Sequence, residues 1–261
     1  MRSNFSPELQ VAVTVVNKAG TMLARRFNSL HSYTLKKDST ELLPEDMLSE
    51  KILAEAIAKN FPSDGILSEE SNFKVNNIDR IWIFDPICGS YSYLRGVETW
   101  SVSLALVENG AYKIGVVYIP LLNLLFSAEA NLGLFLNGTR VNQPGLNNLK
   151  NSFISVEHAV FNSGKLDILK LVKDIKRIRV AHGSGAELAY VASGRLDALI
   201  KTDQTAVHYS GGRALVEIAG AKFCDFSGKR ARVITDNREK VDYIAVRGER
   251  LLEEILGYVR K

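Results

Sequence analysis

Three acidic residues in the first third of the chain follow apolar segments and are suited to binding a metal ion. Glu69 and Glu70 come directly after the short segment 65–68, and Asp85 ends an apolar segment that begins at Ile81. Hard cations such as magnesium prefer oxygen ligands, so a site for them must gather carboxylates from several places in the chain. Two such ions can hydrolyse a phosphate ester by neutralising its oxygens, activating water and stabilising the leaving group.

The turn that contains Asp85 carries the most specific pattern. Residues 82–90 are Trp-Ile-Phe-Asp-Pro-Ile-Cys-Gly-Ser, which resembles the segment Trp-Ile-Ile-Asp-Pro-Ile-Asp-Gly-Thr of the inositol monophosphatase family. Further segments resemble that family in order and spacing, and they lie at 44–46, 68–71, 115–120, 135–138, 183–184, 189–192 and 194–198. The resemblance covers nearly the whole chain, which is therefore identified as a member of this family.

The resemblance implies that the first of two magnesium sites is complete. Glu69 would bind the first ion and orient the attacking water, and Asp85 would bridge both ions. The carbonyl of Ile87 would complete the first site. Ser90 stands where the family has threonine and keeps the hydroxyl that helps to position the water. Glu69, Asp85 and Ser90 are therefore the expected catalytic residues.

The resemblance also implies residues that support this site. Backbone N–H groups of Gly89 and Ser90, at the start of a short helical turn, would face the phosphate as helix N-termini do. Asp46 and Glu70 are expected as acids outside the metal ligands. The expected substrate is a small phosphorylated metabolite, namely a polyol, a sugar or a nucleotide.

Three positions depart from the family pattern. Cys88 replaces the second aspartate of the turn, and His208 replaces the aspartate that opens a C-terminal helix. These two exchanges remove the ligands that only the second metal ion uses. Lys201 falls near a substrate-contacting acid of the family. Together the three exchanges raise the formal charge of the site by about four units, counting the thiol and the imidazole as neutral.

Three interpretations of these exchanges remain open. In the first, one magnesium ion stays at Glu69, Asp85 and Ile87, and the protein is a phosphate-monoester hydrolase with reduced or shifted activity. This is our working prediction. In the second, the protein has lost catalysis and binds a phosphorylated ligand or a protein partner. A phosphate anion would then contact His208, Lys201 and the backbone N–H groups of the turn.

In the third interpretation, Cys88 and His208 bind a softer ion such as zinc, because thiolate and imidazole favour zinc over magnesium. Manganese is kept beside zinc as an alternative metal. Cys88 is not expected to act as a nucleophile, since a cysteine phosphatase needs arginine at the sixth position after the cysteine, where Leu94 stands. His182 sits in no ligand spacing and is expected to be a surface or loop histidine.

Local patterns predict a first half, 1–143, in which helices cover a largely antiparallel sheet. Helices are expected at 7–28 and 44–60, strands at 65–68, 81–85, 101–107 and 112–119, and an irregular segment at 31–43. Asn109-Gly110 and Asn137-Gly138 predict hairpin turns.

After Gln143, strands alternate with helices, which predicts an α/β half, 144–261, with helices on both faces of its sheet. Strands are expected at 152–156, 178–181, 198–200 and 243–246, and helices at 165–173, 186–192, 211–219 and from 249. The polar segment 142–151 is the expected boundary. The resemblance implies the fold class α/β (α+β), as a layered α-β-α-β-α sandwich with the site in the cleft between the halves.

Composition restricts the class of protein. A chain of 261 residues with 46% hydrophobic content is typical of a soluble protein with a sizeable core. No apolar run approaches the roughly 20 residues of a membrane span or forms a signal peptide, so a cytoplasmic protein without membrane contact is expected. Cys88 and Cys224 are expected to be reduced thiols.

Charge argues against binding to nucleic acid. The net charge is +4, and the densest basic segment, 170–179, alternates charged with apolar residues at helical spacing. That pattern indicates the solvated face of an amphipathic helix. A homodimer is expected from the family resemblance alone.

Overall fold

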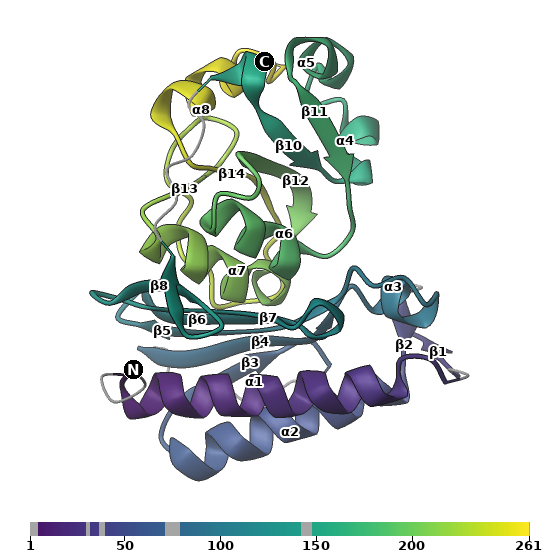
Figure 1. Ribbon diagram of the computed structural model, residues 1–261, viewed down its shortest axis with the longest axis vertical. Helices are drawn as coiled ribbons and strands as arrows, with labels where there is room; N and C mark the ends of the chain where they lie inside the picture. Colours follow the sequence, from purple (N-terminus) through teal and green to yellow (C-terminus); the bar gives the residue numbers. More distant parts are fainter. Residues whose placement is uncertain (1–4, 30–31, 37–39, 71–78, 142–147, 261) are drawn as a thin grey trace.

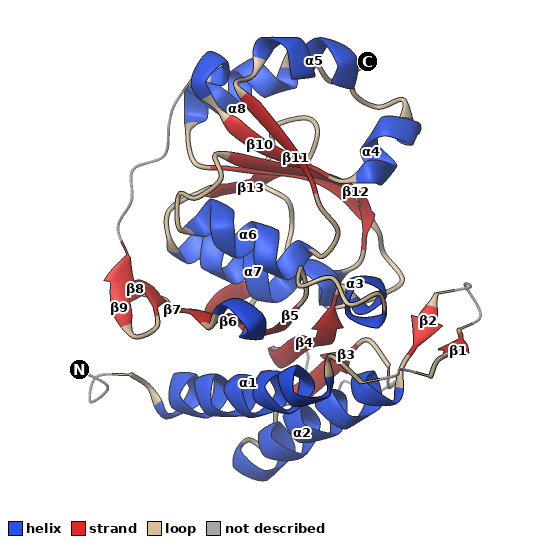
Figure 2. Cartoon of the chain, turned by 45° about the vertical axis from the view of Figure 1, so that its right-hand side comes forward, coloured by secondary structure: helices blue, strands red, loops and turns tan. Residues whose placement is uncertain are grey.

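The computed structural model describes residues 5–29, 32–36, 40–70, 79–141 and 148–260, to which every structural statement refers. Five layers are stacked (Figure 1). Helices α1 (Pro7–Arg26) and α2 (Pro44–Asn60) cover the outer face of a seven-stranded sheet. Helices α6 (Ser184–Ala192) and α7 (Ala206–Ile218) lie between this sheet and a five-stranded one (Figure 2). The expected α-β-α-β-α sandwich is confirmed.

The outer face of the five-stranded sheet is covered by three shorter helices. These are α4 (His158–Ser163), α5 (Ile168–Asp174) and α8 (Glu249–Leu256). Their apolar side chains pack with those of the sheet in one buried cluster. The prediction that helices cover both faces of this sheet is therefore confirmed.

The seven-stranded sheet is antiparallel except for its first pair. Its order is β3-β4-β5-β6-β7-β8-β9, with bounds Gly65–Ser68, Arg80–Cys88, Ser101–Glu108, Ala111–Ile119, Leu124–Glu129, Gly133–Leu136 and Thr139–Val141. Only β3 and β4 run parallel. Asn109 and Gly110 join β5 to β6 with positive φ at both positions, as a tight hairpin turn requires. Asn137 and Gly138 do the same between β8 and β9.

The five-stranded sheet is mixed. Its order is β11-β10-β12-β14-β13, with bounds Arg177–Val180, Phe153–Val156, Ala198–Gln204, Val241–Val246 and Lys222–Cys224. Strand β10 runs parallel to β11 and to β12, while β14 is antiparallel to β12 and to β13. The carboxyl-terminal ends of β10 and β12 therefore lie at the same edge of the sheet. This edge faces the first half of the chain.

Several elements differ from the predictions. The segment expected to be irregular contains a two-stranded sheet of β1 (Thr34–Leu35) and β2 (Glu41–Leu42). Strands of two residues are too short to show a periodic pattern. Helix α1 ends at Arg26 rather than at 28. The predicted boundary between residues 143 and 144 falls outside the described residues, so the division into two halves remains a prediction.

Capping residues fix where the two outer helices begin. The Ser6 hydroxyl accepts the N–H of Leu9 at 3.1 Å, and Pro7 supplies the first turn of α1. In α2, Asp46 Oδ2 accepts the N–H of Leu43 at 2.9 Å. Asp46 is therefore held at the start of α2, beside the loop that leads into the cleft.

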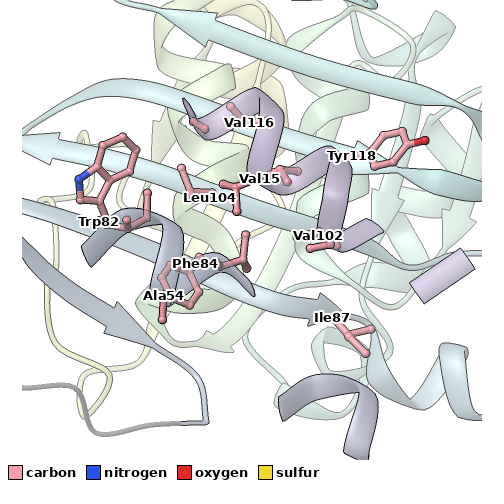
Figure 3. Close-up of a cluster of buried hydrophobic side chains, with 14 of the residues drawn as sticks. Val15, Ala54, Trp82, Phe84, Ile87, Val102, Leu104, Val116 and Tyr118 are labelled. Atoms are coloured by element: carbon pink, nitrogen blue, oxygen red, sulfur yellow. The ribbon is translucent and has the colours of Figure 1, made fainter. Parts of the chain in front are cut away.

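Buried side chains fix β4 on both faces. Trp82, Phe84 and Ile87 point into the cluster beneath α1 and α2 (Figure 3). The alternate residues, Ile81 and Ile83, pack on the other face against α7. Burying a large apolar side chain contributes about 1.5–3 kcal/mol, so this strand is firmly placed and the turn at its end is held in position. None of the described helices is both long and apolar enough to span a membrane.

Candidate active site

A cavity of about 240 Å³ lies where the two halves meet. It is lined by every residue predicted to bind metal or phosphate: Glu69, Asp85, Ile87, Cys88, Gly89, Ser90, Lys201 and His208. Asp46 and Glu70 are not among the residues that line it, and their role outside the metal ligands remains a prediction. A larger groove of about 590 Å³ between α1 and α2 is mainly apolar. We place the site in the smaller cavity because it contains the carboxylate cluster.

Pro86 shapes the turn that supplies the longest run of residues along this cavity. Strand β4 pairs with β5 up to Asp85 and again at Cys88, with a register shift between them. Proline has no N–H to donate and is tolerated in a sheet at such irregularities. The Pro86 carbonyl oxygen accepts a hydrogen bond from the Ser49 hydroxyl of α2 at 2.8 Å. Gly89 then takes φ 101°, in the left-handed region where glycine is favoured, and α3 (Ser90–Leu94) begins.

Glu69, Asp85 and His208 form a cluster with metal-ligand spacing. One ligand atom from each lies within 4.8 Å of the others. The Asp85 side chain is 1% exposed, and its Oδ1 has no hydrogen-bond partner among the described residues. An unsatisfied buried carboxylate oxygen is costly, and a hard cation would satisfy it. The residues present therefore fit a magnesium ion at this position.

His208 lies in the first turn of α7 and contacts the cluster directly. Its Nδ1 is 3.2 Å from Asp85 Oδ2. Burial disfavours the charged ring, but the hydrogen bond to Asp85 and the charges of Glu69 and Asp85 outweigh it and raise the pKa of His208 to about 8. Below that pH the ring is a cation, in a position where the family pattern has an anion.

Glu69 is itself affected by its neighbours. Burial and the charge of Asp85 raise the pKa of Glu69 to about 7, against the opposing charges of His208 and Lys36. Lys36, in the loop after β1, lies 2.8 Å from Glu69 Oε1 and 2.6 Å from Glu70 Oε1. This contact was not predicted, because nothing in the local pattern around Lys36 marks it as part of the site.

Cys88 lines the cavity and also contacts the helices between the two sheets. Its thiol is 2% exposed, and Sγ accepts the N–H of Gly185 at 3.2 Å and lies 3.7 Å from the His208 carbonyl oxygen. Burial and the charge of Asp85 raise the pKa of Cys88 well above its usual value. Its sulfur is outside the cluster of ligand atoms found among the described residues. The structure thus gives no support to a zinc site formed by Cys88 and His208.

Lys201 lines the cavity and forms an ion pair. Its side chain is 1% exposed, and Nζ lies 3.4 Å from Glu157 Oε1. Glu157 Oε2 accepts the amide N–H of Gln204 at 2.9 Å, and the Gln204 carbonyl oxygen accepts the Ser184 hydroxyl at 3.0 Å. His182 Nδ1 lies 3.5 Å from Glu157 Oε1. The second half of the chain therefore contributes a connected polar wall.

Most residues of this polar wall were not predicted from the sequence. His182 is a loop residue with an exposed side chain, as predicted, and it also lines the cavity, as do Glu157 and Gln204. A signal for Glu157 existed, since it comes directly after β10, which is parallel to β12. Residues that follow neighbouring parallel strands meet at one sheet edge, where α/β proteins bind ligands.

Comparison with known proteins decides the family. The model of the inositol monophosphatase family matches residues 4–261. The chain belongs to the inositol monophosphatase family. A Thermotoga maritima protein named fructose-1,6-bisphosphatase/inositol-1-monophosphatase is 32% identical over 230 residues, covering 88% of this chain and 89% of that protein. A Nus factor SuhB of Xylella fastidiosa is 32% identical over 238 residues, covering 88% and 86%.

Two solved structures share the fold of this chain. An IMPase from Thermotoga maritima superposes with a TM-score of 0.87 at 29% identity, covering 97% of this chain and 96% of that one. The extragenic suppressor protein suhB from Bartonella henselae gives a TM-score of 0.86 at 26% identity, covering 97% and 98%. Within this family fold, the chain places a thiol and an imidazole at Cys88 and His208.

Proposed function

We propose that the protein is a phosphate-monoester hydrolase of the inositol monophosphatase type, dependent on one magnesium ion. Glu69, Asp85 and the carbonyl of Ile87 would hold the ion. The observation that supports this most directly is Asp85, whose buried Oδ1 lacks a partner among the described residues and whose carboxylate lies within the Glu69 and His208 cluster.

The protein's own groups have separate roles in this proposal. Bound magnesium would supply charge neutralisation and a more acidic water. Glu69 orients the attacking water, and the Ser90 hydroxyl helps to hold it. Backbone N–H groups of Gly89 and Ser90 bind the phosphoryl oxygens. His208, a cation below pH about 8, stabilises negative charge beside Asp85.

The size of the cavity narrows the substrate. Sites for drug-sized ligands usually enclose about 300–1,000 Å³, whereas this cavity encloses about 240 Å³. A small phosphorylated polyol or sugar therefore fits the described cavity better than a nucleotide does. The carbon skeleton of such a substrate would lie toward the wall formed by Lys201 and Glu157.

Phosphate release from purified protein tests the proposal. Inositol phosphate, fructose bisphosphate and adenosine bisphosphate are compared with magnesium, manganese or zinc. We expect release with magnesium and a loss of at least about a hundredfold in Glu69→Gln, since an oxygen ligand of the ion is weakened. Glu55→Gln, which changes an exposed glutamate of α2, is the matched control. Release that survives in Glu69→Gln would place the activity elsewhere.

A second candidate is a catalytically silent relative that binds a phosphorylated ligand or a protein partner. Two contacts favour it, because Lys36 and His208 already place positive charge on Glu69 and Asp85. Several relatives also carry the name Nus factor SuhB rather than the name of an enzyme. Calorimetry with inorganic phosphate in the absence of metal, together with no turnover on any substrate, would support this candidate. The homodimer remains a prediction, which light scattering would check.

A further inference from the structure

Lys201 lines the same cavity as the turn of Asp85 and Ser90. It is contributed by β12, whereas the turn is contributed by β4 and α3. A phosphoryl group bound at the turn leaves the carbon skeleton of the ester facing β12. Beside His208, which contacts Asp85 directly, the charged side chains that the second half offers to that skeleton include Lys201 and its partner Glu157.

The ammonium group of Lys201 keeps capacity to bind a ligand. Its contact with Glu157 is 3.4 Å, longer than the roughly 2.7–2.9 Å of a strong charge-assisted hydrogen bond. Glu157 is also engaged by the Gln204 amide at 2.9 Å. Since an ammonium group has three donors, the pair with Glu157 positions Lys201 without using all of them.

The sign of the charge decides which chemical group this wall recognises. A carboxylate accepts hydrogen bonds from polyol hydroxyls, whereas a lysine only donates and is strongest toward anions. Glu157, the acid that the second half contributes to the described lining, is already shared between Lys201, His182 and Gln204. The remaining donor capacity therefore points to an anionic acceptor on the ligand.

We infer that Lys201 is a specificity-determining residue that selects phosphate esters whose carbon skeleton carries a second anionic group, a carboxylate or another phosphate. The inference rests on the proposed function, because it assigns the substrate class of the same cavity. Glu157 acts through Lys201 and is a positioning residue. The Asp85 end of the cavity treats every phosphate ester alike, and the Lys201 end distinguishes among them.

A matched pair of substrates tests this inference. Glycerol 2-phosphate and 2-phosphoglycerate share a three-carbon skeleton and the position of the phosphate, but one carries a hydroxymethyl group where the other carries a carboxylate. We expect kcat/KM to favour 2-phosphoglycerate by about tenfold or more in the wild type, the effect of one hydrogen bond to a charged group. Lys201→Gln should bring the two substrates to within about threefold, and Lys201→Arg should keep the preference.

Controls separate specificity from folding. Lys201→Gln leaves Glu157 without its cationic partner, so Lys201→Gln combined with Glu157→Gln is measured beside it. Lys165→Gln removes a lysine that pairs with Asp242 at the surface and should keep the wild-type preference. Thermal unfolding identifies any variant that fails to fold.

Two outcomes would overturn the inference. An equal loss on both substrates in Lys201→Gln would show that Lys201 contacts the reacting phosphoryl group. Equal kcat/KM for the two esters in the wild type would show that no second anion is selected. Binding of both esters to Glu69→Gln, measured by calorimetry, reports the preference without turnover. A failure of hydrolysis alone, with the binding preference intact, would therefore count against the proposed function and not against this inference.

Discussion

The Nδ1 atom of His208 lies 3.2 Å from Oδ2 of Asp85, where the start of α7 meets the end of β4. A protein cation thus occupies one side of the buried carboxylate, while Oδ1 on its other side has no partner among the described residues. The two oxygens of the Asp85 carboxylate therefore have different surroundings.

Restoring two aspartates should restore a second metal ion. In Cys88→Asp combined with His208→Asp, hard oxygen ligands replace a thiol and an imidazole. We expect the magnesium stoichiometry by calorimetry to rise from one to two per chain. Cys88→Asp alone should lower stability in the absence of magnesium by about 1–3 kcal/mol, because it places a carboxylate in a buried position beside Asp85. Unchanged stoichiometry in the double variant would contradict a lost second site.

Removing Lys36 should strengthen magnesium binding. Its ammonium group lies 2.8 Å from Glu69 and 2.6 Å from Glu70, so an incoming ion competes with it for the Glu69 carboxylate. Lys36→Met should lower the Kd for magnesium by about three- to tenfold, equivalent to roughly 1 kcal/mol. Lys51→Met, which removes an exposed lysine of α2, should leave the Kd unchanged. A weaker affinity in Lys36→Met would mean that Lys36 supports the ion instead.

The thiol of Cys88 should be inert. Burial raises its pKa well above the usual value, and the thiolate is the form that reacts. We expect iodoacetamide to leave Cys88 unmodified in the native protein, as judged by peptide mass, and Cys88→Ala to keep kcat within about threefold of wild type, since a neutral thiol supplies no nucleophile. Cys224→Ala is the control for loss of a buried thiol. Rapid alkylation accompanied by inactivation would revive a nucleophilic role.

Asp46 should make stability depend on pH. Burial raises the pKa of Asp46 to about 8, so the folded protein holds a proton that the unfolded chain releases near pH 4. The free energy of unfolding should therefore fall as pH rises from about 4 to 8. Asp46→Asn, neutral throughout, should lack this part of the slope. Chemical denaturation without metal at pH 5, 7 and 9 gives the free energy of unfolding of the wild type and of Asp46→Asn. Because Glu69 and His208 titrate in both proteins, their contributions cancel in the difference between the two free energies. If the free energy of unfolding changed with pH equally in both proteins, the raised pKa of Asp46 would be contradicted.

Local signals in the sequence predicted the elements that carry the site. Pro44 and Glu45 marked the start of α2, and the predicted strand 65–68 is β3. Asn109-Gly110 marked the turn between β5 and β6. These signals succeed because capping and left-handed turns involve residues only a few positions apart. The strands β1 and β2 were missed because each has only two residues.

Polar contacts between distant segments could not be predicted in this way. Glu157 and Lys201 lie 3.4 Å apart because β10 and β12 are neighbours in the sheet. His182 joins them from the segment before α6. Nothing within either segment states which partner it will meet, since the order of strands in a sheet is set by packing of the layers.

The sequence by itself determined which donors stand at the turn after β4: an aspartate, a thiol, a glycine and a hydroxyl, at Asp85, Cys88, Gly89 and Ser90. Only the tertiary structure decided where those groups point. The Cys88 sulfur accepts the N–H of Gly185, 97 positions away. The physical reason is that the side-chain environment at a strand end is created by whichever helices pack there. Here α6 and α7 fill the space between the two sheets and surround the thiol.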